Sequence, residues 1–260
     1  MQTFEQTLTS SKQFVESPFD LHPKQKVIVA VAHPDDEALM VGALQEVRRY
    51  GHDLIAVVAT DGTASTKGDQ EFVQAGNRRS EAQVSFGALG LTSDEQRYIG
   101  LDDGQLHNTR PLVHFTQTLA DIALQHEAAM ILTTGEHGFG HRDHRAVHLG
   151  ALAATTIVRR LSGQQTTVWG LSDRPGEATF AINPREKLER FMPHKSQFDI
   201  WVPGDPHAPA DAIPFHGLLV SPYTAEDIAA YDLAGLFGWE SYNRHDAPKT
   251  KNLYDILDAA

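Results

Sequence analysis

Residues 26–37 read KVIVAVAHPDDE, and this stretch decides the fold. Its first seven residues form a short continuous apolar run, which is typical of a buried parallel strand. A helical pattern of apolar residues follows over 38–51, and a second apolar run covers 54–60. A strand, a helix and a second strand in this order predict a βαβ unit at the start of the fold.

The alternation continues along the chain. We expect helices over 72–89, 111–127, 143–161 (with Asp143 as N-cap) and 184–194, and strands over 129–134, 168–171, 179–182 and 217–220. A polar segment over 61–69 is expected to be a loop. Alternating strands and helices predict an open α/β sheet with helices on both faces. In such folds the active site lies at the carboxyl ends of the strands.

The composition fits one globular unit. The chain has 260 residues with no internal repeat and no linker, so we expect an N-terminal extension over 1–25 and a single α/β domain over 26–260. That domain includes an irregular, proline-rich region beyond residue 203. There are no cysteines, which excludes disulfides, thiolate nucleophiles and cysteine-based zinc sites. The 14 histidines supply nitrogen ligands instead.

The charge excludes two classes of partner. A formal net charge of −12 argues against a nucleic-acid groove, where a basic face is expected, and against an anionic membrane surface. We find neither a signal-peptide pattern nor an apolar run long enough to span a bilayer. A cytoplasmic location is therefore expected, and the oligomeric state is left open.

The loop after the first expected strand is the first candidate for chemistry. His33, Asp35, Asp36 and Glu37 bring an imidazole and three carboxylates to a place where a dinucleotide-binding fold has glycines. Such crowding of negative charge is unfavourable unless a cation lies among the carboxylates. The acidic residues alone also fit a helix N-terminus, which the helix dipole favours. That alternative does not explain His33 at the end of an apolar strand.

A second candidate lies in the glycine- and histidine-rich loop over 135–144. His141 and His144 are three residues apart near the start of the expected helix, so both can face one point. His148, four residues after His144, is a rival on the same helical face. We assign His148 a structural role because it lies a turn further from the strand ends. The two loops together predict a metal site.

Two motifs carry a resemblance. AHPDDE at 32–37 and HRDH at 141–144 resemble the signature motifs of the PIG-L / LmbE-like family of zinc-dependent N-acetylglucosaminyl deacetylases. Weaker similarities are RRSE at 78–81 followed by LG at 89–90, DG at 103–104 and HKSQ at 194–197. The resemblance implies a Rossmann-like fold with a mostly parallel sheet. It also implies hydrolysis of an N-acyl group, acetyl in the named family, from an amino sugar or its conjugate.

The resemblance also implies roles for individual residues. One Zn²⁺ per chain is expected on His33, Asp36 and His144, with Asp35 as the general base. His141 is expected beside the substrate carbonyl, and Asp143 is expected to orient it and to raise its pKa. Arg78 is expected to bind substrate. Three protein ligands leave an open position for water, as in catalytic zinc sites.

Alternatives remain for the roles of individual residues and for the function of the protein. Arg78 and Glu81, three residues apart, also fit a solvated ion pair on a helix. The Asp103-Gly104 pair is a turn signal, and His194 closes a helix; neither is expected to be catalytic. The alternative functions are a metal-dependent phosphoesterase, which usually needs a second metal, and a sugar-binding protein whose structural metal has a closed ligand shell.

Overall fold

A computed structural model of the chain describes residues 19, 23–64, 66–67, 71–72 and 75–171, together with five short strand segments beyond them. The main helices of the described chain are α2 (Val41–Arg49), α3 (Ala75–Ala88), α4 (Thr109–His126) and α5 (Arg142–Ser162). Short 3-10 turns η1 (Asp36–Met40), η2 (Ser93–Glu95) and η3 (Gly138–Gly140) lie between them. Within the described residues, no helix combines the length and the apolar character that a membrane span requires.

The central sheet has seven strands in the order β5-β2-β1-β6-β7-β12-β8. Its members are β1 (Lys26–Val31), β2 (Asp53–Thr60), β5 (Gln96–Leu101), β6 (Met130–Thr134), β7 (Thr167–Leu171), β8 (Phe180–Ile182) and β12 (Glu240–His245). The five strands from β5 to β7 are parallel, and β12 is antiparallel to both of its neighbours. The expected α/β class with a mostly parallel sheet is confirmed.

The order of the strands places a site between β1 and β6. From β1 the chain moves outward to β2 and β5, then returns across the sheet through α4 to β6, on the other side of β1. The loops that follow β1 and β6 therefore diverge to opposite faces and leave a crevice at their carboxyl ends. This is the topological switch point at which open α/β sheets bind ligands.

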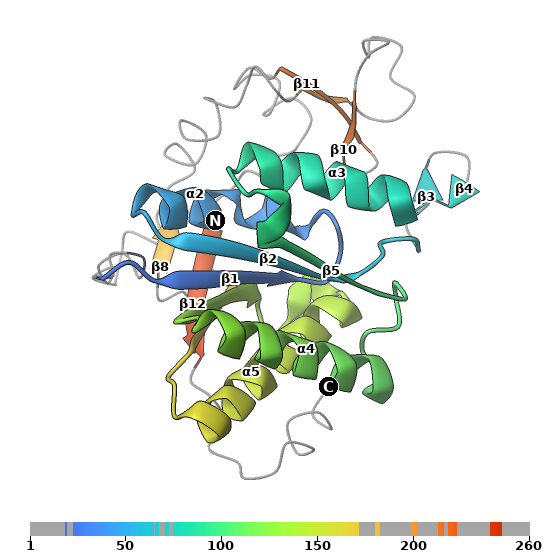
Figure 1. Ribbon diagram of the computed structural model, residues 1–260. Helices are drawn as coiled ribbons and strands as arrows, with labels where there is room; N and C mark the ends of the chain where they lie inside the picture. Colours follow the sequence, from blue (N-terminus) through green and yellow to red (C-terminus); the bar gives the residue numbers. More distant parts are fainter. Residues whose placement is uncertain are drawn as a thin grey trace, which may run out of the picture.

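Helices cover both faces of the sheet, with α2 and α3 on one side and α4 and α5 on the other (Figure 1). Alternate residues of β1 pack against the helices on opposite faces of the sheet. Val27 and Val29 pack with α2 and α3, whereas Ile28 and Ala30 pack with α4 and α5. All four are completely buried. This two-sided burial explains why the strand is a continuous apolar run rather than an alternating one.

Besides shifts of a few residues at helix ends, three differences from the expected elements matter for the site and its surroundings. Strand β5 was not expected, because its polar, partly exposed sequence QRYIGL fits an edge strand and hides the apolar signal. Asp143 as N-cap of α5 is wrong: the N-cap is His141, whose backbone is extended, and Asp143 lies inside the first turn. The expected loop over 61–69 contains β3 (Thr66–Lys67), which pairs with β4 (Glu71–Phe72).

The remaining strands form a separate small sheet. In it, β11 (Leu218–Pro222) lies between β10 (Ile213–Phe215) and β9 (Asp199–Trp201). The expected strands over 179–182 and 217–220 correspond to β8 and β11. The expected helix over 184–194 and the extension over 1–25 lie largely or wholly outside the described residues.

Close packing of α4 against α5 gives a stability prediction. A Cβ atom at Gly150 would lie 2.6 Å from Cδ1 of Phe115, a fully buried ring. Gly150→Ala should therefore lower the free energy of unfolding by about 1–3 kcal/mol, as overpacking does. Gly87→Ala is the matched control, because it is also helical but has no atom within 4 Å of the added Cβ, and should be neutral or stabilising by up to ~1 kcal/mol. Urea unfolding measures both, and equal stability of the two variants would contradict the packing.

Candidate metal centre and active site

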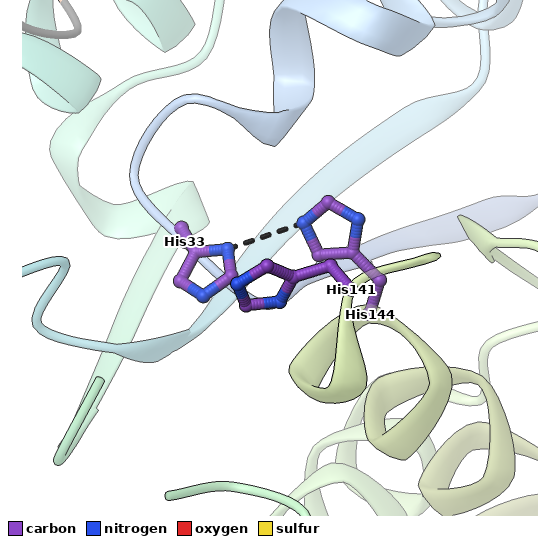
Figure 2. A group of neighbouring side chains, drawn as sticks. All are labelled: His33, His141 and His144. Atoms are coloured by element: carbon purple, nitrogen blue, oxygen red, sulfur yellow. Dashed lines mark hydrogen bonds between the residues drawn. The ribbon is translucent and has the colours of Figure 1, made fainter. Parts of the chain in front are cut away.

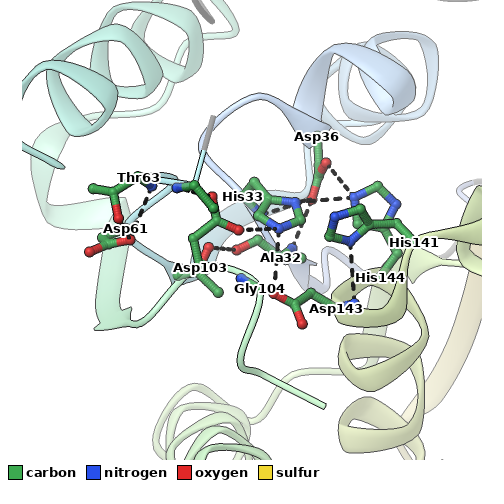
Figure 3. A network of polar contacts seen from close by, with 12 residues as sticks. Ala32, His33, Asp36, Asp61, Thr63, Asp103, Gly104, His141, Asp143 and His144 are labelled. Atoms are coloured by element: carbon green, nitrogen blue, oxygen red, sulfur yellow. Dashed lines mark hydrogen bonds and ion pairs between the residues drawn. The ribbon is translucent and has the colours of Figure 1, made fainter. Parts of the chain in front are cut away.

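Side chains from three loops meet at the switch point (Figure 3). His33 and Asp36 follow β1, His141 to His144 follow β6 at the start of α5, and Asp103 follows β5. Because all three strands are parallel, their carboxyl ends lie along one edge of the sheet. Residues from distant parts of the sequence are thereby brought within hydrogen-bonding distance.

The turn after β1 shapes one wall of the site. The backbone N–H groups of Ala32 and His33 donate to Oδ2 of Asp36, at 2.9 and 2.8 Å. These two bonds fold the carboxylate back over the end of the strand. Its other oxygen, Oδ1, then lies 2.9 Å from Nε2 of His144 across the crevice.

Three side chains converge on one point in a way that fits a metal. Nδ1 of His33 lies 3.2 Å from Nε2 of His144 and 3.5 Å from Oδ2 of Asp36. Tetrahedral zinc with ligands at about 2.0–2.1 Å separates neighbouring ligand atoms by about 3.3 Å. The two nitrogens are spaced accordingly, and each lies at a similar distance from one oxygen of Asp36, Oδ2 for His33 and Oδ1 for His144. All three residues are buried.

Electrostatics also favours a cation here. Burial lowers the pKa of His33, but Asp103, Asp143 and Asp36 raise it more, to about 12. Burial likewise raises the pKa of Asp36, yet the charges of His144 and His33 bring it far below its ordinary value. Buried carboxylates surrounding an imidazole thus stabilise positive charge at this place, which a divalent ion supplies.

His141 borders the same point from the exposed side. One ring nitrogen of each of His33, His141 and His144 lies within 4.8 Å of the others (Figure 2). The His141 ring centroid is 4.7 Å from that of His33 and 4.8 Å from that of His144. Its Nδ1 accepts a hydrogen bond from the backbone N–H of Asp143 at 3.3 Å. This bond favours the neutral tautomer that carries its proton on Nε2.

The expectation that His141 has a raised pKa overall is wrong, although Asp143 by itself does raise it. Burial and the neighbouring His33 and His144 lower that pKa, and together they outweigh the attraction of Asp143. The fully buried Asp143 carboxylate instead contacts Gly104 N–H at 2.7 Å, Nδ1 of His107 at 3.3 Å and Nε2 of His33 at 3.6 Å. It is the backbone of Asp143, rather than its carboxylate, that hydrogen-bonds the His141 ring.

Asp35 and Arg78 form an ion pair beside the candidate metal ligands. Nη2 of Arg78 donates to Oδ2 of Asp35 at 2.6 Å. The arginine side chain is 1% exposed, whereas the aspartate side chain is 37% exposed. The alternative of a solvated pair on the helix surface is therefore wrong for Arg78. The guanidinium is therefore held inside the protein, and Asp35 is the more exposed partner of the pair.

A family model described as "PIG-L: GlcNAc-PI de-N-acetylase" matches residues 28–155, which contain this whole cluster. This part of the chain belongs to the PIG-L family. A curated relative from Corynebacterium glutamicum, 1D-myo-inositol 2-acetamido-2-deoxy-alpha-D-glucopyranoside deacetylase, is 25% identical over 171 residues. That match covers 57% of this chain and 57% of the relative, so it spans little more than half of the relative's length.

Solved structures show that proteins with different activities share this fold. N,N'-diacetylchitobiose deacetylase from Pyrococcus horikoshii is 16% identical, with a TM-score of 0.58 over 94% of this chain and 90% of that chain. GalB, the 4-carboxy-2-hydroxymuconate hydratase from Pseudomonas putida, is 14% identical, with a TM-score of 0.57 over 88% and 99%. Since a deacetylase and a hydratase have this fold, the function must be argued from the site.

The PIG-L segment also contains site residues that sequence reasoning missed. Asp103 was interpreted as part of a turn; Gly104, with φ of +77°, does make that turn, but Oδ1 of Asp103 also lies 3.0 Å from Nε2 of His33. His107 contacts Asp143 from the same loop. Recognising β5 as a strand would have indicated both, since they follow its carboxyl end.

Two other histidines were singled out in the sequence. His148 is buried, and its Nδ1 lies 3.1 Å from the carbonyl oxygen of Thr134, away from the metal ligands. This contact agrees with the structural role assigned to it. His194 lies outside the described residues.

Proposed function

We propose that this protein is a zinc-dependent amide hydrolase that removes an N-acetyl group from an amino sugar or its conjugate. The observation that carries the proposal is the convergence of His33, Asp36 and His144 beside a half-exposed Asp35 and an exposed His141. The PIG-L match and the deacetylase name of the Corynebacterium relative support this substrate class. We further propose that residues 26–260 form one domain after an extension over 1–25.

His33, Asp36 and His144 would hold one Zn²⁺ per chain. Their donor set, two imidazoles and a carboxylate, is that of catalytic rather than structural zinc sites. When bound, zinc supplies Lewis acidity, which lowers the pKa of a coordinated water and polarises the substrate carbonyl.

We assign Asp35 the role of general base. Its Oδ2 is held by Arg78, so we assign proton transfer to Oδ1. In this role Asp35 accepts a proton from the attacking water as the oxygen–carbon bond forms, and returns it to the amide nitrogen as the carbon–nitrogen bond breaks. Arg78 fixes the position of Asp35; because it is buried, we propose this positioning role in place of direct substrate binding.

We assign His141 the role of stabilising the negative charge that develops on the carbonyl oxygen. With Nδ1 accepting from the Asp143 backbone, Nε2–H is the ring's donor. A hydrogen bond from that atom strengthens as the carbonyl becomes an oxyanion, and such bonds contribute mainly in the transition state. Since the pKa of His141 is lowered, we assign the return of the proton to Asp35 rather than to His141.

The test is release of acetate from a defined panel. We expect release from N-acetylglucosamine oligomers or from an inositol N-acetylglucosaminide, and none of phosphate from a phosphate ester. Activity should disappear with a chelator and return with about one equivalent of zinc per chain, measured by elemental analysis. Phosphate release would favour the phosphoesterase, and zinc binding without turnover of any member would favour a sugar-binding protein. Activity that survives complete removal of metal would contradict the proposal.

A further inference from the structure

A carboxylate contacts His33 on the side of the ring that faces away from the proposed metal. Nδ1 of His33 points toward His144 and Asp36, whereas Nε2 lies 3.0 Å from Oδ1 of Asp103 (Figure 3). Both side chains are buried, at 10% and 8% exposure. Asp143 is more distant from the same nitrogen, at 3.6 Å.

Asp103 is itself held from two directions. The backbone N–H of Ala64, in the loop after β2, donates to its Oδ2 at 2.9 Å. The next residue, Gly104, donates its N–H to Asp143 at the start of α5, at 2.7 Å. The loops after β2 and β5 and the first turn of α5 thereby fix the carboxylate, which leaves Oδ1 directed at His33.

We propose that Asp103 is a positioning residue that accepts the Nε2–H of His33 and so presents Nδ1 of that ring to the metal. The proposal rests on the metal site of the proposed function. A histidine ligand with one nitrogen on a metal carries its proton on the other, and a carboxylate acceptor there fixes the tautomer and the ring plane and makes the ligand more basic. Asp103 meets this requirement with a buried carboxylate whose other oxygen, Oδ2, accepts from the backbone of Ala64.

The experiment compares Asp103→Asn with Asp61→Asn. Asp61 lies in the neighbouring loop after β2, where its Oδ1 accepts hydrogen bonds from the backbone and hydroxyl of Thr63. It is a matched carboxylate that has no imidazole contact among the described residues. Zinc affinity is measured by competition with a chromophoric chelator. We expect Asp103→Asn to weaken zinc binding by about 10–100-fold, the usual effect of removing such a partner. We expect Asp61→Asn to stay within about twofold of the unsubstituted protein.

A second measurement separates positioning from a general loss of structure. In the zinc-loaded protein with ¹⁵N-labelled histidine, we expect the His33 proton on Nε2, with a downfield resonance that moves upfield in Asp103→Asn. The spectrum of the unsubstituted protein tests the tautomer of His33 even if Asp103→Asn fails to fold. A His33 proton on Nδ1, or a zinc affinity of folded Asp103→Asn within twofold of the unsubstituted protein, would overturn the proposal while leaving the proposed function intact. Failure of the unsubstituted protein to bind zinc would overturn both.

Discussion

Asp35→Asn is expected to lower kcat/KM for the N-acetylated substrate by about 10²–10⁴-fold while the zinc content stays at one per chain. Asparagine has nearly the same shape and its oxygen can still accept from Arg78, but it cannot take a proton from water. The measurement is steady-state acetate release, with metal content determined on the same preparation.

The matched control is Asp102→Asn. Asp102 is exposed in the loop after β5, one residue before Asp103. The activity of Asp102→Asn should stay within about twofold of that of the unsubstituted protein. Because Arg78 is buried, Asp35→Asn also weakens an ion pair, so thermal unfolding should be followed for both variants. Full activity of Asp35→Asn would move the base elsewhere, with Glu37 the next candidate.

His144→Ala and His141→Ala should have opposite effects on zinc and on turnover. Loss of His144 removes a proposed ligand whose Nε2 lies 2.9 Å from Asp36, so we expect zinc affinity to fall by more than about 100-fold, beyond the effect of losing a ligand's hydrogen-bond partner. Loss of His141 should leave zinc affinity within a few-fold but lower kcat by about 10²–10³, the cost of removing one oxyanion donor. KM should change little, because that bond matters mainly in the transition state.

Zinc competition and single-turnover acetate release on both variants separate the two histidines, whose rings lie side by side in Figure 2. If His141→Ala loses zinc while His144→Ala retains it, the two assignments are reversed. If both variants lose zinc, the site has four protein ligands, and a mechanism that needs an open coordination position is contradicted.

The sequence by itself determined the class of fold and the place of the chemistry. Burial of β1 on both faces requires a continuous apolar run, and the polar motif directly after it can only lie at the carboxyl end of that strand. The same reasoning applies to β6 and the histidines after it. These are local features, because strand periodicity and the residues that follow a strand are read within about ten positions.

Only the tertiary structure decided which side chains meet. His33 and His144 are in contact but lie 111 residues apart in the sequence, and the contacting residues Arg78 and Asp35 lie 43 residues apart. Spacing within each segment carries no information about such pairs, so the sequence did not predict the Arg78–Asp35 contact and allowed a solvated surface pair that the burial of Arg78 contradicts. The lowered pKa of His141 likewise depends on burial and on rings from other loops. Asp103 was missed for a related reason: it follows an edge strand, whose partial exposure weakens the apolar pattern, and only pairing of β5 with β2 brings it beside His33.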